Sequence, residues 1–264
     1  MATDEVLDEV LTARDGAVTT ITINRPAQRN ALSPNVSRGL RRALAAARQD
    51  DTTRVVVLRG AGDRAFCAGA DLSSLTQGAG FAELHDARGE IAGLFEDLWA
   101  LGKPTIARVQ GYALAGGFGL ALACDFLVAA SDAVFGTPEI DVGLWPFMIT
   151  VPLLRAMAPK QALELMMTAR RVGADEGLRM GFVNRVVPPP DLDGAVAELA
   201  SALAAKSPAV MRLGRTTFYR VVDDLAARAL PYLHSQLTVN AGFEDAAEGV
   251  AAFKEKRPPQ WRGR

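Results

Sequence analysis

The sequence is poor in the residues that disulfide frameworks, metal centres and catalytic triads require. It has two cysteines, Cys67 and Cys124, and two histidines among 264 residues. The cysteines show neither a disulfide framework nor a metal-ligand spacing, and both stand among small residues typical of a core. His85 and His234 fall on helical patterns and have no serine or carboxylate partner arranged as a triad. We therefore expect no metal site and no triad chemistry.

An excess of charge and long apolar runs are also absent. The formal net charge at pH 7 is −1, which argues against a nucleic-acid footprint or a membrane-surface patch. No apolar run approaches the length of a membrane span. Residues 1–5 are acidic and lack the basic and apolar regions of a signal peptide. We expect a cytoplasmic protein that binds neither nucleic acid nor membrane, and in which local positive groups hold any polyanionic ligand.

The remaining pattern is that of a globular α/β protein, with 49% hydrophobic and 22% charged residues. A strand–strand–helix rhythm recurs at residues 17–49, 54–101 and 105–123 and predicts a layered core. Pro188–Pro190 marks a boundary, after which the pattern is helical throughout. We expect an α/β core over residues 1–190 and a C-terminal helical region for oligomer contacts over 191–264.

A glycine-rich segment, Gly111–Asp125, stands at the centre of this organisation. It follows a predicted buried strand, Thr105–Val109, and leads into the small-residue helix Leu120–Ala123. Strand, glycines and helix in that order direct backbone N–H groups and the positive helix end toward one point, where an oxyanion would be stabilised. The glycines alone would equally permit a tight turn and close helix packing. Their spacing is not the dinucleotide fingerprint.

Taken together, several segments resemble the crotonase superfamily, the enoyl-CoA hydratase/isomerase family. The main ones are Asn24–Leu32, Ala65–Leu72 and Lys103–Asp125. Further similarity lies at Pro138–Ile140, Arg171–Val183 and Glu248–Lys256. The resemblance covers nearly the whole chain in order. It implies a crotonase-like spiral of ββα turns with a C-terminal helical trimerisation region, assembled as a homotrimer or a dimer of trimers.

The resemblance also implies acyl-CoA thioester substrates, with coenzyme A as part of the substrate and no separate cofactor. By position, Ala70 and Gly116 supply the two backbone N–H groups of an oxyanion hole. Each lies in a glycine loop ahead of a helix, where unpaired N–H groups are expected. Enolate chemistry needs such donors because negative charge moves onto the thioester oxygen as a Cα proton leaves.

The acid–base chemistry depends on two positions of the family pattern. Hydratases of this family hold one water between two glutamates; one matches Glu139, whereas the other falls at Gly119. A single carboxylate still suffices to move a proton from C2 to C4 of a 3-enoyl thioester. Isomerases of the superfamily can lack the same carboxylate, and Val142–Phe147 resembles their sequence more than the hydratase one. We expect isomerisation with Glu139 as sole general acid/base. The alternatives are hydration with an acid from another position, thioester hydrolysis, or a non-catalytic acyl-CoA-binding scaffold.

Further site residues follow from the resemblance. We expect Asp141 to face away from Glu139 in an extended loop and Asp71 to cap a helix rather than to act on substrate. The backbone of loops 27–29 and 68–72, together with a C-terminal Phe and Lys of a neighbouring subunit, would hold coenzyme A. Lys254 and Arg257 lie close enough to replace that lysine, and Arg29 is either a phosphate contact or an exposed loop residue. The residues assigned to coenzyme A are Ala27, Arg29, Ala68, Asp71, Leu72, Phe253 and Lys256. The acyl pocket would be lined by four residues for which plain core is an equal alternative: Phe118, Trp145, Phe147 and Met148.

Overall fold

The computed structural model describes residues 9–71, 81–224 and 226–264. Leu72 and the side chain of His85 lie outside this described part. The larger sheet begins with an antiparallel hairpin, β1 (Val10–Asp15) and β2 (Val18–Ile23), turned at Gly16 with φ +53°. Parallel strands β3 (Val55–Gly60), β5 (Thr105–Val109), β7 (Phe126–Ala130) and β10 (Arg185–Val187) then follow β2 in that order.

A second, smaller sheet is built from short strands. Its strands, in order, are β4 (Ala65–Cys67), β6 (Tyr112–Leu114), β8 (Val134–Gly136) and β9 (Val172–Gly173). Strands β4, β6 and β8 are parallel, while β9 is antiparallel to β8. The turns β3–β4, β5–β6 and β7–β8 thus each give their first strand to the larger sheet and their second strand to the smaller one. The strand–strand–helix rhythm of the sequence is confirmed at residues 54–101 and 105–123, whereas residues 17–49 hold one strand, β2, before the first helix.

The helices close the turns. Helix α1 (Pro34–Gln49) begins with an N-cap: the Ser33 hydroxyl accepts a hydrogen bond from Val36 N–H at 3.1 Å, and Pro34 takes the first helical position. The other helices are α2 (Phe81–Trp99), α3 (Gly116–Ala123), α4 (Thr150–Ala156), α5 (Pro159–Thr168), α6 (Ala174–Met180), α7 (Leu192–Ala204), α8 (Pro208–Val221), α9 (Ala226–Ala241) and α10 (Glu244–Glu255). Short 3₁₀ turns lie at η1 (Pro26–Gln28), η3 (Pro138–Val142) and η4 (Pro189–Asp191).

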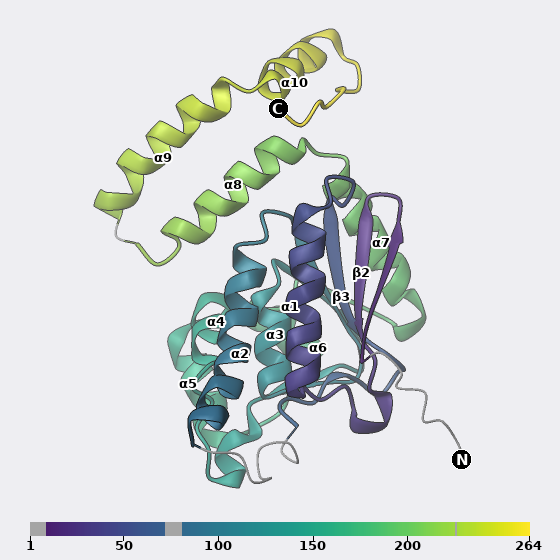
Figure 1. The fold of residues 1–264 in the computed structure, drawn as a ribbon, viewed down its shortest axis with the longest axis vertical. Helices are drawn as coiled ribbons and strands as arrows, with labels where there is room; N and C mark the ends of the chain where they lie inside the picture. The colour runs from purple at the N-terminus through teal and green to yellow at the C-terminus, as the bar shows by residue number, and fades with distance from the viewer. Residues whose placement is uncertain (1–8, 72–80, 225) are drawn as a thin grey trace.

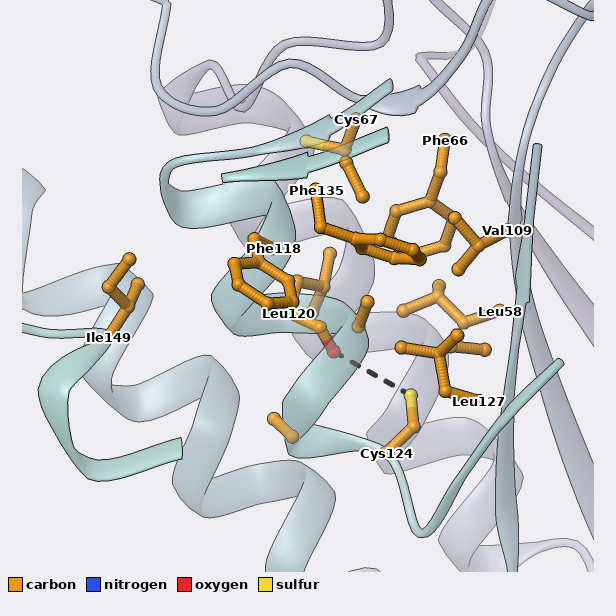
Figure 2. Close-up of a cluster of buried hydrophobic side chains, with 14 of the residues drawn as sticks. Leu58, Phe66, Cys67, Val109, Phe118, Leu120, Cys124, Leu127, Phe135 and Ile149 are labelled. Atoms are coloured by element: carbon orange, nitrogen blue, oxygen red, sulfur yellow. Dashed lines mark hydrogen bonds between the residues drawn. The ribbon is translucent and has the colours of Figure 1, made fainter. Parts of the chain in front are cut away.

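The main core fills the space between the two sheets and α3. Figure 2 shows Leu58, Val109 and Leu127 facing Leu120 of α3. Both cysteines lie in this core as free thiols, and burial raises the pKa of Cys67 to about 12. The Cys124 thiol donates to the Leu120 carbonyl at 3.7 Å (Figure 2). Protonated buried thiols of this kind are inert.

The C-terminal helices divide into two groups. Helix α7 packs its buried Leu192, Val196 and Ala200 against Val57 and Ile106 of the larger sheet. By packing, α7 therefore belongs with the core, although it follows the boundary placed at residue 190. Helices α8, α9 and α10 instead extend from one end of the molecule (Figure 1).

Asp125 joins this extension to the core. Its carboxylate accepts hydrogen bonds from Arg215 Nε at 2.7 Å, the Tyr219 hydroxyl at 2.6 Å and the Thr105 N–H at 2.7 Å. The Arg215 guanidinium also donates to the carbonyls of Leu98 and Trp99. The Arg215 and Asp125 side chains are only 6% and 14% exposed, so this is a nearly buried, fully bonded ion pair.

Removing Asp125 should weaken the fold strongly. Asp125→Ala leaves the Arg215 charge buried without its partner, and we expect a loss of about 3–5 kcal/mol in the free energy of unfolding, measured by urea titration. Asp223→Ala is the control, because the Asp223 side chain is 64% exposed in its pair with Arg155; its loss should stay below about 1 kcal/mol. Equal losses for the two variants would contradict this role of Asp125.

Candidate active site

The smaller sheet gathers the predicted catalytic positions at one edge. Ala70 follows β4, Gly116 follows β6 and Glu139 follows β8. These three strands are adjacent and parallel, so their carboxyl ends meet at one edge of the sheet, where α/β proteins bind ligands. The topology therefore brings together the three residues that the resemblance assigned to catalysis.

The loops after β4 and β6 pack backbone against backbone. A Cβ atom on Gly69, whose φ is +100°, would lie 2.7 Å from the Ala115 Cβ, and one on Gly117 would lie 2.2 Å from the Cys67 carbonyl oxygen. Neither distance is compatible with a side chain, so both positions require glycine. In this packing an ideal Cβ on Gly116 lies only 3.9 Å from the Ala70 nitrogen. The main-chain amides of residues 70 and 116 are thus neighbours.

Both amides are available as donors. The surrounding polar groups are already paired: Leu32 N–H donates to Gly69 O at 2.8 Å, Asp71 N–H to Leu32 O at 3.0 Å, and Ala115 N–H to Gly136 O at 2.9 Å. Among the described residues, neither the Ala70 nor the Gly116 N–H donates to another protein group. Gly116 is the first residue of α3, where an N–H has no acceptor within the helix. Two adjacent unpaired amides are the arrangement that an oxyanion hole requires.

Ala115 holds this arrangement in a strained backbone conformation. Its φ of 51° and ψ of −130° lie outside the regions that L-residues readily adopt. Such a conformation costs on the order of 1–3 kcal/mol and persists only where the surrounding structure enforces it. The turn lies directly before Gly116, so it sets the direction in which the Gly116 N–H points.

Glu139 lies on a 3₁₀ turn rather than in the extended loop expected from the sequence. Pro138 starts this turn and Gly143, in the left-handed region at φ +74°, ends it. The expectation of an extended loop is wrong because these two residues together favour a compact turn. Asp141 is exposed.

The environment of Glu139 favours the protonated acid. The side chain is half-buried, and its Oε2 atom is fully buried without a hydrogen-bond partner among the described residues. Burial raises the pKa of Glu139, while the positive charge of Arg171 partly opposes the shift. A carboxyl group whose pKa lies closer to neutrality than usual is suited to both accept and return a proton.

The two loops assigned to coenzyme A are hydrogen-bonded to each other. Ala68 N–H donates to the Arg29 carbonyl at 3.0 Å, which joins the loop after β4 to the loop after β2. Ala27 and Arg29 are exposed. The Asp71 carboxylate forms an ion pair with Arg25 at 2.9 Å, so it ties the two loops together; the residues it was expected to cap lie outside the described part.

The four acyl-pocket candidates differ in burial. Phe118 is fully buried and packs against Phe135 and Phe182, with ring centroids 5.4 and 5.2 Å away, so it takes the alternative core position. Trp145 is half-buried against the core. Phe147 and Met148 are 71% and 39% exposed on the loop that carries Glu139. Sequence reasoning missed three further exposed apolar residues of that loop, which its alternating apolar pattern could have revealed: Ile140, Val142 and Leu144.

The C-terminal coenzyme A candidates lie elsewhere. Phe253 and Lys256 are exposed on and next to α10, at the end of the molecule opposite to the carboxyl ends of β2 and β3 (Figure 1). Arg257 is paired with Glu248 at 2.6 Å and with Glu255 at 2.6 Å. It is therefore less suited than Lys256 to hold a phosphate.

Two neighbouring unpaired amides and a half-buried carboxyl group at one edge of an α/β spiral are groups that enzymes use to stabilise an oxyanion. The chain belongs to the enoyl-CoA hydratase/isomerase family, whose sequence model matches residues 13–264. It is therefore an acyl-CoA enzyme of the crotonase type.

Three relatives illustrate the similarity. The chain is 40% identical to a carnitinyl-CoA dehydratase of Salmonella arizonae over 95% of this chain and 97% of that protein. The crystal structure of an enoyl-CoA hydratase from Mycobacterium smegmatis superposes with a TM-score of 0.92 at 35% identity, covering 96% of this chain and 98% of the other. An enoyl-CoA hydratase/carnitine racemase structure from Magnetospirillum magneticum gives 0.88 at 31% identity, covering 98% and 97%.

The described part of the chain contains no helix long and apolar enough to cross a membrane. Within the same residues, no group of three or more histidine, cysteine, aspartate or glutamate side chains is placed to hold a metal ion.

The raised pKa of Glu139 predicts a pH-dependent effect on stability. Because the folded-state pKa lies above the unfolded one, protonated Glu139 favours the fold below the unfolded pKa, and this contribution is lost as pH rises through the folded pKa. Glu139→Gln removes the ionisation. We expect its Tm, relative to wild type, to be higher at pH 8 than at pH 4.

Calorimetry at the two pH values measures this difference, with Asp141→Asn as the exposed control on the same turn. A Tm difference for Glu139→Gln that stays constant between pH 4 and pH 8 would show that Glu139 carries no burial penalty.

Proposed function

We propose that this protein isomerises 3-enoyl-CoA thioesters to 2-enoyl-CoA thioesters, with Glu139 as its single general acid/base. One observation carries the proposal: a buried carboxyl oxygen of Glu139 and the two amides, none of them paired within the part of the chain that the structure describes, lie at the same sheet edge, while position 119 has no side chain. The site thus offers one proton carrier and one oxyanion hole.

The reaction balances with these groups alone. The Glu139 carboxylate takes a proton from C2, and the electron pair delocalises onto the thioester oxygen and C4. The Ala70 and Gly116 N–H groups stabilise this dienolate, each by about 3 kcal/mol. The Glu139 acid then returns the proton to C4. The raised pKa of Glu139 supports both steps because it narrows the difference between the pKa of this base and the pKa of the substrate C–H group that it deprotonates.

A second candidate is the addition or removal of water, favoured by the name of the relative that is 40% identical, carnitinyl-CoA dehydratase. This reaction shares the enolate but needs a proton for the hydroxyl that leaves C3. Glu139 would have to serve both positions, or an acid from another part of the site would serve the second.

Turnover in D₂O distinguishes these reactions. We expect trans-3-enoyl-CoA to give the 2-enoyl ester with deuterium at C2 and C4, whereas hydration gives a 3-hydroxy ester and hydrolysis frees the thiol. Glu139→Gln should lower isomerisation by about 10²–10⁴-fold and leave acyl-CoA binding intact. Wild-type turnover in the Gln variant would overturn the role of Glu139. A wild-type protein that binds the ester without any reaction would indicate a scaffold.

We also propose that the chain assembles as a homotrimer or a dimer of trimers. Helices α8 and α10 border an open apolar cavity of about 960 Å³, and apolar side chains are exposed along the extension: Phe218, Leu237, Val239, Val250 and Phe253. Helix α10, which carries Phe253 and ends beside Lys256, lies at the end of the molecule opposite to the carboxyl ends of β2 and β3 (Figure 1). A contact with coenzyme A therefore needs a neighbouring copy. A cytoplasmic location remains a prediction from the sequence.

The assembly is testable in solution. Light scattering should give three or six times the subunit mass of 28.0 kDa. Lys256→Ala should raise KM for acyl-CoA about tenfold with little change in kcat, since loss of binding common to ground and transition states leaves kcat unchanged. Lys160→Ala, on the core helix α5, is the matched control. A monomer with an unchanged KM would contradict the assembly.

A further inference from the structure

Gly119 lies in a space that other side chains have already filled. It is buried in α3 one helical turn after Gly116, and residues three apart lie on the same helix face. A Cβ atom on Gly119 would lie 2.3 Å from Ile149 Cγ2, 2.8 Å from Ile149 Cβ and 3.0 Å from Phe95 Cζ. Both neighbours are only 2% exposed. Apolar atoms of Ile149 and Phe95 thus occupy the space that a side chain at position 119 would need.

Ile149 reaches this space from the segment that carries Glu139. It directly precedes α4, and its carbonyl accepts the Leu153 N–H at 3.0 Å. Figure 2 shows Ile149 on the side of α3 away from Leu58 and Val109. The same stretch of chain therefore supplies the proton carrier to the sheet edge and an apolar wall to α3.

We propose that Ile149, backed by Phe95, determines the reaction specificity of the site by keeping water away from the α3 side of the bound acyl chain. This inference rests on the proposed function, in which Glu139 is the only acid. A held water needs two to four polar partners, and neither Ile149 nor Phe95 offers one. Without a water held beside C3, the dienolate accepts its proton at C4 and no oxygen is added.

The geometry predicts that an acid at position 119 is insufficient by itself. In Gly119→Glu the new Cβ would overlap Ile149, so either Ile149 or the α3 backbone must move. Ile149→Gly removes both overlapping Ile149 atoms. Ile149→Val keeps its Cβ and a Cγ atom, so it is the matched control in which the overlap remains.

The experiment compares hydration of trans-2-enoyl-CoA to the 3-hydroxy ester in the wild type, Gly119→Glu, Ile149→Gly, and Gly119→Glu combined with Ile149→Gly or with Ile149→Val. We expect the Glu/Gly double variant to hydrate at least about tenfold faster than either single variant, and the Glu/Val variant to show no gain. Hydration by Gly119→Glu alone at the rate of the Glu/Gly variant overturns the inference, as does a folded Glu/Gly variant that shows no gain.

A second variant decides the matter if the double variants do not fold. Ile149→Ala should raise the ratio of 3-hydroxy ester to isomerised product from trans-3-enoyl-CoA about tenfold, and an unchanged ratio overturns the inference. A different result would contradict the proposed function itself: isomerisation that persists in Glu139→Gln while residue 149 is wild type.

Discussion

The rest of the structure depends on one constraint: the main-chain N–H groups of Ala70 and Gly116 are neighbours and have no protein acceptor among the described residues. The loops after β4 and β6 meet this constraint by packing backbone against backbone, which is possible because Gly69 and Gly117 have no side chain. Ala115, directly before Gly116, adopts a strained backbone conformation with positive φ, which is unfavourable in free energy. The spiral supplies the neighbouring parallel strands that hold both loops in place.

The segment from β8 to α4 brings the carboxyl group of Glu139 to the same sheet edge as these amides. Its 3₁₀ turn holds Glu139 with one oxygen buried and without a hydrogen-bond partner in residues 9–71, 81–224 and 226–264, and the poor solvation of that carboxylate raises its pKa. A few residues later the same segment packs Ile149 against Gly119. An apolar surrounding therefore has two effects: it adjusts the proton affinity of the acid, and it leaves no place for a second acid or for a water bound to it.

Local sequence patterns predict much of this organisation. The strand Thr105–Val109 agrees with its prediction because β-branched runs act over a few residues, and the Ser33–Pro34 start of α1 is local in the same way. Ala70, Gly116 and Glu139 were placed by family resemblance, and the topology explains why they meet. Strands β6 and β9 escaped prediction because each is too short to show a period. Their pairing depends on partners distant in sequence.

Other features depend on contacts that no local pattern reveals. The core position of Phe118 is set by Phe135 and Phe182, and the bond between Asp125 and Arg215 joins residues 90 apart in sequence. The overlap at position 119 arises because α4 returns to α3. The sequence showed that a carboxylate was missing there, whereas only the packing shows what took its place.

A crystal structure with a bound acyl-CoA tests most directly whether the two amides bind the thioester oxygen. The account predicts that the thioester oxygen lies about 2.7–3.1 Å from the nitrogens of both Ala70 and Gly116, with the Glu139 carboxyl group against C2 and C4. A thioester oxygen exposed to solvent, or amides that bind other protein atoms while the ester is present, would contradict it.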